Sequence, residues 1–189
     1  MFVPLNINFL DGNIICTGSN NGDLEASFAG GSGTVLVDWS NDGIGDYNDN
    51  TNISGVSAGT YTIVVKDALN CTDTGIVVIT EIDPPSNITA FTAGSSTVCA
   101  DQLGVMYAVA SQTNATFFWN YTGGTASING SGNNVTLDFG NNPATGTISV
   151  YAQNSCSTTA ALSATIDVLA IPTISISGNN CAKFFANLV

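Results

Sequence analysis

Residues 59–71 read Gly-Thr-Tyr-Thr-Ile-Val-Val-Lys-Asp-Ala-Leu-Asn-Cys, and residues 146–156 read Gly-Thr-Ile-Ser-Val-Tyr-Ala-Gln-Asn-Ser-Cys. Each stretch starts with Gly-Thr, largely alternates two sets of side chains, and reaches a cysteine through a short polar turn. Alternation with a period of two predicts a strand that buries one face. Because the pattern recurs together with its cysteine, we predict that the chain contains two copies of one β-strand unit.

The cysteines and tryptophans repeat with the same period. Cys16, Cys99 and Cys181 are spaced by 83 and 82 residues, and the first two units share the order Cys16, Trp39, Cys71 and Cys99, Trp119, Cys156. We predict disulfides Cys16–Cys71 and Cys99–Cys156, each closing a loop of about 55 residues and restricting the unfolded chain. Cys181 is then the first cysteine of a further unit, so we expect the native chain to continue past Val189. An intermolecular bond through Cys181 is the alternative.

Short alternating or β-branched segments fill the rest of the chain, and turn residues separate them. The predicted strands are 5–9, 24–28, 35–39, 53–56, 61–66 and 74–82 in the first unit, and 105–109, 115–119, 126–128, 135–139, 147–152 and 162–169 in the second. Asp83-Pro84-Pro85-Ser86 marks the boundary, because two prolines cannot lie within a central strand. We therefore predict an all-β chain of two tandem immunoglobulin-like antiparallel β-sandwiches, residues 1–83 and 84–171. Residues 172–189 start a further repeat or form an exchanged tail strand.

Composition excludes several functions. Lys66 and Lys183 are the only basic residues against 14 acidic ones, and the net charge of -12 excludes nucleic acid and anionic membranes as partners. The chain lacks His and Arg, so acid-base and phosphate chemistry have few groups to use and no enzyme is expected. No apolar run is long enough to cross a bilayer. Five cysteines without a Cys-X-X-Cys pair favour disulfides and an oxidising compartment.

An acidic stretch, residues 38–49, includes the first tryptophan. With Asp38 as position 1, oxygen-bearing residues recur at the ligand spacing of a twelve-residue calcium loop, and Gly43 occupies the position of the sharp bend. The predicted calcium ligands are Asp38, Ser40, Asp42, the Ile44 carbonyl, Asp46 and Asp49. The alternative is a metal-free turn, because Asn, Asp and Gly form Asx-turns by themselves.

Three aromatic residues are candidates either for the core or for contact with a ligand. Alternation along 35–39 predicts that Trp39 faces the core and that Asp38 faces out. Trp39 and Trp119 are expected to be core residues and not sugar-stacking platforms, since both lie between two cysteines. Tyr47 is the exposed aromatic residue for which we expect ligand contact.

Four motifs distinguish the first unit: Cys16-Thr-Gly-Ser-Asn-Asn-Gly, Gly30-Gly-Ser-Gly, Val37-Asp-Trp-Ser and Ser57-Ala-Gly-Thr-Tyr-Thr-Ile-Val-Val-Lys-Asp. In these motifs, residues 5–83 resemble the SprB-type repeat of bacterial gliding-motility adhesins. The second unit carries Ser96-Thr-Val-Cys99, Phe118-Trp-Asn, Gly130-Ser-Gly-Asn-Asn and Asn154-Ser-Cys156, and residues 84–171 resemble a PKD-like, immunoglobulin-like domain. Both resemblances imply secreted, surface-displayed stalk or adhesin modules. The enlarged acidic connection departs from the repeat, so the resemblance implies nothing about calcium.

These observations favour a non-catalytic segment of a secreted or cell-surface adhesin or stalk, stiffened by calcium. Its expected partners are other domains of a larger surface protein, neighbouring subunits, or surface glycans and proteins. One alternative is a structural subunit of an extracellular fibre that assembles by strand addition through its tail. A second alternative is a calcium-dependent glycan-binding module.

Overall fold

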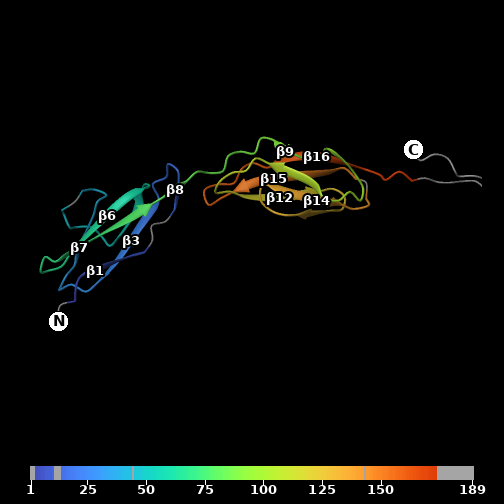
Figure 1. Ribbon diagram of the computed structural model, residues 1–189. Coiled ribbons are helices and arrows are strands. Elements are labelled where there is room, and N and C mark those ends of the chain that lie inside the picture. The colour runs from blue at the N-terminus through green and yellow to red at the C-terminus, as the bar shows by residue number, and fades with distance from the viewer. Residues whose placement is uncertain (1–2, 11–13, 44, 143, 174–189) are drawn as a thin grey trace, which may run out of the picture.

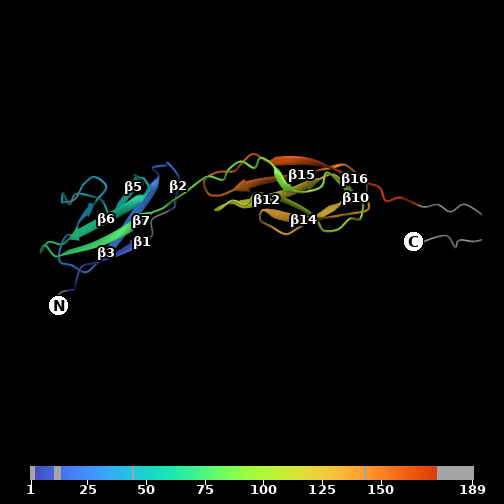
Figure 2. The same cartoon turned by 45° about the horizontal axis from the view of Figure 1, so that its top comes forward.

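The computed structural model describes residues 3–10, 14–43, 45–142 and 144–173. All regular structure in these ranges is β-strand, and Figures 1 and 2 show two groups of strands that lie end to end, joined by the segment after β8. The described part of the chain has no helix of the length and apolarity needed to cross a bilayer. The predicted all-β class is confirmed. Most of the predicted tail, 174–189 with Cys181, lies outside the described residues.

The first unit contains two antiparallel three-stranded sheets and one short parallel pair. The first sheet has the order β1-β3-β5, and the second has the order β4-β6-β7, while β2 pairs in parallel with β8. The bounds are β1 Asn6–Leu10, β2 Ile15–Cys16, β3 Gly22–Ala29, β4 Leu36–Trp39, β5 Asn52–Val56, β6 Gly59–Lys66, β7 Thr72–Ile79 and β8 Glu81–Ile82. The predicted strand 74–82 is thus two strands, interrupted at Thr80.

The first core forms between these sheets around Trp39. Trp39 is fully buried and packs in a cluster with Leu24, Ile63 and Ile79. The alternation along β4 correctly predicted that Trp39 faces the core. Its neighbour Asp38 is on the opposite face but only 1% exposed, so the prediction that it faces solvent is wrong.

The second unit is a sandwich of two four-stranded sheets. Their orders are β10-β16-β15-β12 and β13-β14-β11-β9, and β10 again pairs in parallel with the last strand. The bounds are β9 Phe91–Ala93, β10 Thr97–Cys99, β11 Val105–Val109, β12 Thr116–Thr122, β13 Ala126–Asn129, β14 Asn134–Phe139, β15 Gly146–Gln153 and β16 Leu162–Leu169. Leu137, Ile148 and Ile166 are fully buried between the sheets. Trp119 is half-buried and packs against this core.

The two units share a strand plan and differ at one connection. In each, a strand bearing the tryptophan pairs with a long strand, which pairs with the strand that follows it, β7 in the first unit and β16 in the second. The second unit then has an extra edge strand, β13, after its tryptophan strand β12. The first unit has no strand between β4 and β5, and residues 40–51 form the acidic turn in its place.

The predicted cysteine pairing is wrong. The structure joins Cys16 to Cys156, with their Cα atoms 5.5 Å apart, and leaves Cys71 and Cys99 free and exposed. Cys16 lies beside Ile82, past the end of β7, whereas Cys71 precedes the start of β7. Eight strand residues at about 3.4 Å each separate the two ends, far beyond the reach of a disulfide.

The second predicted pair fails for the same reason. Cys99 pairs with Leu169 at the end of β16, whereas Cys156 follows β15 near the start of β16. Each predicted bond would have to run the length of a sandwich. The observed bond instead joins the end of the first sandwich from which the chain leaves to the facing end of the second sandwich.

Candidate calcium site

The acidic turn between β4 and β5 folds back along β4. The backbone N–H of Asp49 donates to the carbonyl of Val37 (3.0 Å), which forms a bridge outside the regular strands. Gly45 has a φ of 112°, a conformation that glycine adopts without steric penalty, and its N–H donates to the Oδ2 atom of Asp38 (2.5 Å). The turn therefore covers the outer face of β4 and buries Asp38.

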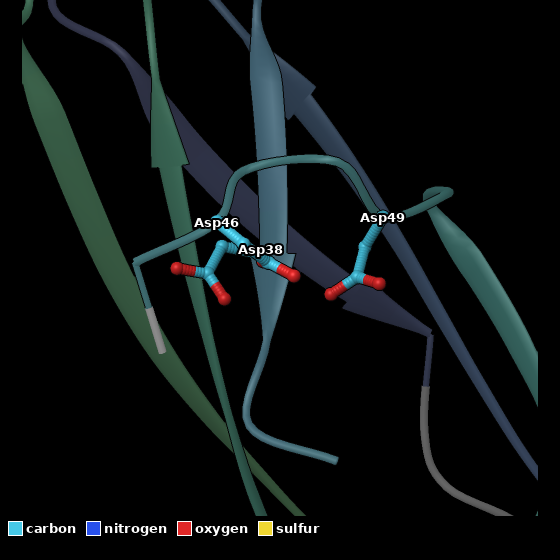
Figure 3. Close-up of side chains that lie close together, drawn as sticks. All are labelled: Asp38, Asp46 and Asp49. Carbon is cyan, nitrogen blue, oxygen red and sulfur yellow. The ribbon is translucent and has the colours of Figure 1, made fainter. Parts of the chain in front are cut away.

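Three carboxylates converge under this turn. Asp38 extends from β4, and Asp46 and Asp49 extend from the turn toward it (Figure 3). One oxygen atom from each lies within 4.8 Å of the other two. We call Asp38, Asp46 and Asp49 the acidic trio.

The members of the trio differ in burial and in hydrogen bonding. Asp49 accepts a hydrogen bond from the backbone N–H of Trp39 at its Oδ2 atom (2.5 Å). Asp38 accepts one bond at Oδ2, but its Oδ1 atom is buried and has no partner among the described residues. Asp46 is exposed, so ions can reach the trio from solvent. An ionised carboxylate that is 1% exposed with one unsatisfied oxygen requires a compensating charge or donor.

A second buried carboxylate in the same unit shows how such a group is normally satisfied. Asp67 accepts backbone N–H bonds from Ser32, Leu69 and Cys71, at 2.9, 2.9 and 2.8 Å. Burial alone would raise the pKa of Asp67, but these three donors outweigh it and hold the pKa below its ordinary value of 3.8. Asp38 has one such donor, so its remaining oxygen is available to a cation.

The geometry of the trio fits calcium. Oxygen atoms that each lie about 2.4 Å from one ion are at most about 4.8 Å apart, and calcium accepts six to eight oxygens in flexible arrangements. All three ligands are carboxylates, which suit a hard divalent cation, and no nitrogen or sulfur donor is among them. Water would have to complete the coordination on the open side of Asp46.

The structure brings together only part of the predicted ligand set. Asp38, Asp46 and Asp49 converge, whereas Asp42 is exposed and outside the trio. Ser40 continues the β4–β6 ladder: its N–H donates to the Thr62 carbonyl, and its Oγ atom accepts from the Thr62 N–H, both at 2.9 Å. Ile44 lies outside the described residues. The turn is thus anchored to a strand at one end and does not present every oxygen of the twelve-residue spacing.

Tyr47, which we expected to contact a ligand, and the two tryptophans, which we expected to be core residues, all have internal partners. Tyr47 is half-buried, and the Nζ atom of Lys66 lies 3.7 Å from the centre of its ring. This cation–π contact fixes the turn to β6 and occupies one ring face. Trp39 is fully buried, and Trp119 donates its Nε1–H to the Gly132 carbonyl (2.9 Å) while packing against Phe91. Trp39 is therefore a core residue, as predicted.

Strand order and tandem packing define a chain of immunoglobulin-like β-sandwiches. Residues 84–166 match the family model of the PKD-like domain. The resemblance of residues 5–83 to the SprB-type repeat stays a prediction, because the family match begins at residue 84. Searching curated protein sequences finds no match to this chain.

Solved structures support the same fold. The chain is similar to murine CEACAM1b, with a TM-score of 0.52 and 14% identity over 87% of this chain and 100% of that one. It is also similar to an E-to-A variant of a three-immunoglobulin titin fragment, with a TM-score of 0.50 and 13% identity over 89% of this chain and 66% of that one. These identities show the fold alone. Together with the disulfide, the immunoglobulin-like and PKD-like units indicate an extracellular protein.

Proposed function

We propose that this chain is a segment of a secreted or cell-surface stalk or adhesin that holds two sandwiches in line and resists extension. The observation that carries the proposal is the Cys16–Cys156 disulfide, because it joins one unit to the next. A bond that only stabilised a unit would close a loop within it. We propose no catalytic role for a chain without His or Arg.

Noncovalent contacts support a stiff junction around the disulfide. The Asn154 side-chain amide donates to the carbonyl of Asp83 (2.8 Å), which ties the second unit to the start of the linker. The Gln112 side chain accepts from the Ser86 N–H and donates to its carbonyl, both at 2.8 Å. Between these anchors, Pro84 and Pro85 have restricted backbones. The linker is thereby held to the second unit at both of its ends.

The disulfide also changes how the chain carries tension. A pull applied to the two chain ends passes directly from Cys16 to Cys156, so the 140-residue separation between them is bypassed. At about 3.5 Å per extended residue, the segment between the two cysteines would add about 490 Å to the length of the chain, and the disulfide prevents this extension. Both cores could lose structure under force without lengthening the stalk by that amount.

Single-molecule force spectroscopy tests this role on the full chain. With handles at both ends, we expect the oxidised chain to show a contour length about 490 Å shorter than the Cys16→Ser/Cys156→Ser variant. The Cys71→Ser/Cys99→Ser variant is the matched control and should behave like the oxidised parent. Full extension of the oxidised parent without reductant would overturn the proposal.

We also propose that calcium binds the acidic trio and braces the first unit. The supporting observation is Asp38, a carboxylate with 1% exposure and an unpartnered Oδ1 atom that lies among two further carboxylates. When bound, calcium would offset two of the three negative charges of the trio, and Asp38, Asp46 and Asp49 would hold it between β4 and the turn. Isothermal titration of the full chain should show one site in the range of about 10⁻⁴ to 10⁻³ M. No heat at millimolar calcium would refute the site without affecting the disulfide argument.

A further inference from the structure

Cys16 and Cys99 occupy the same place in their two units. Each ends a short strand that pairs in parallel with the last strand of its unit, Cys16 opposite Ile82 and Cys99 opposite Leu169. In both cases the next residue donates its N–H to the carbonyl opposite the cysteine, at 3.0 and 2.8 Å, and a turn follows. We call this the strand-end position, and it lies where the chain leaves each sandwich.

Cys71 and Cys156 also occupy corresponding places. Each lies in the turn that follows the long strand of its unit, Cys71 between β6 and β7 and Cys156 between β15 and β16. The first residue of each turn accepts the cysteine N–H at its side-chain oxygen, Asp67 for Cys71 (2.8 Å) and Asn154 for Cys156 (2.9 Å). We call this the turn position, and it lies at the opposite end of the sandwich.

The observed disulfide therefore joins the strand-end position of one unit to the turn position of the next. The two exposed free cysteines occupy the same two kinds of position. Cys99 has the strand-end position of the second unit, and Cys71 has the turn position of the first. They lie at the outer ends of the two-unit segment, because β10 and the β6–β7 turn are at its two tips (Figure 2). We propose that Cys99 of one copy bonds to Cys71 of a second copy, and links copies head to tail.

Apolar side chains at both tips support docking before the bond forms. Leu169, directly opposite Cys99, is 52% exposed, and Leu103 and Ile171 nearby are 73% and 50% exposed. Leu69, in the turn with Cys71, is 57% exposed. End-to-end docking would remove these side chains from water and bring the two thiols together.

The chemistry is thiol–disulfide exchange with a low-molecular-weight disulfide as oxidant. One protein thiolate attacks the oxidant and releases one small thiol, and the second protein thiolate attacks the mixed disulfide and releases the other. The two protein thiols lose two protons and two electrons, and the two sulfurs of the oxidant gain them. Oxidised glutathione supplies this reactant in the test.

The experiment uses the full chain with Cys181→Ser, so that only Cys71 and Cys99 are free among the five cysteines. Two further variants, Cys71→Ser and Cys99→Ser, carry tags of different mass and are oxidised alone and as an equimolar mixture. Non-reducing gels should show a ladder for the parent, monomers for each single variant, and a heterodimer at least tenfold more abundant than either homodimer in the mixture. Melting curves check that each variant stays folded.

Random thiol oxidation gives a different pattern. It would produce the two homodimers and the heterodimer in a ratio of 1:2:1, and each single variant would dimerise alone. Either of these results, or monomers throughout with Cys16–Cys156 formed, would overturn the proposal. A Ser111→Cys substitution in the Cys71→Ser chain is the matched control, because it restores an exposed thiol away from both tips and should not restore the ladder.

Discussion

Replacing Asp38 by asparagine should stabilise the first unit without calcium and remove the stabilisation that calcium gives to the parent. In chelator, Asp38→Asn removes one of three negative charges within 4.8 Å. Two unit charges at that distance repel by roughly 1 kcal/mol in water and roughly 3.5 kcal/mol at an effective dielectric constant of 20. Asp38→Asn removes two such pairs, Asp38–Asp46 and Asp38–Asp49. At the lower figure, set by the exposed Asp46, the free energy of unfolding should therefore rise by about 2 kcal/mol.

Calcium should offset most of this advantage at a dissociation constant of about 10⁻³ M and reverse it at about 10⁻⁴ M. For a dissociation constant of about 10⁻³ to 10⁻⁴ M, 10 mM calcium stabilises the parent by about 1.4 to 2.7 kcal/mol. In a unit of this size that corresponds to a rise in Tm of roughly 5 to 20 °C. Asp38→Asn loses the buried anionic ligand, so its Tm should move little with calcium.

The assay is thermal melting followed by tryptophan fluorescence in a Trp119→Phe background, so that Trp39 alone reports the first unit. Asp42→Asn is the matched control, because it removes the same charge from the same turn at an exposed position outside the trio. The control should keep the full response to calcium. The reasoning is refuted if the parent melts at the same temperature in chelator and in calcium, or if Asp42→Asn loses as much of the response as Asp38→Asn.

Four further substitutions test the fold. Trp39→Phe should lower the free energy of unfolding by about 2 kcal/mol in urea titrations, and Trp119→Phe by about 1 kcal/mol, because Trp39 is fully buried and Trp119 is half-buried. Gly30→Ala should destabilise the first unit by about 2 kcal/mol or more, since φ is 79° and the added Cβ would lie 2.0 Å from the Pro4 carbonyl oxygen; an unchanged urea midpoint would contradict this. Because its pKa is lowered in the folded state, Asp67 contributes stability above pH 3.8 that is lost as pH falls through the folded pKa. The difference in stability between the parent and Asp67→Asn should therefore be largest near neutral pH and shrink below pH 3.8, and a pH-independent difference would contradict the assignment.

Alternation in the sequence was sufficient to predict the strands that bury a face. The predicted strands 105–109 and 162–169 coincide with β11 and β16, because each is long enough to show a period of two. The strands β2, β9 and β10 have two or three residues each and went unpredicted. Their pairing depends on a neighbouring strand, β8 for β2, β11 for β9 and β16 for β10, and not on a pattern of their own.

The candidate site was predictable in its location but not in its membership. The sequence places Asp38 on the outer face of β4, and only the fold of the turn decides that this face is covered. Ser40 has the spacing of a ligand, but its backbone and hydroxyl groups both bond to Thr62 because the β4–β6 ladder continues past Trp39. Ser40 is therefore not part of the candidate calcium site, although its spacing from Asp38 predicted that it would be, because it is hydrogen-bonded to a strand that is distant in the sequence.

The cysteines show how a correct repeat can give a wrong pairing. The spacing showed which cysteines occupy equivalent positions in the two units, but it did not show which of them lie close together. The parallel pairing of β2 with β8 places Cys16 where the chain leaves the first unit. The turn before β16 places Cys156 where the chain enters the second unit, so the two cysteines meet across the junction. Within a unit, the strand-end and turn positions are always one strand length apart. The bond is therefore a property of the tandem array, and two neighbouring units are the smallest piece of the chain in which it can form.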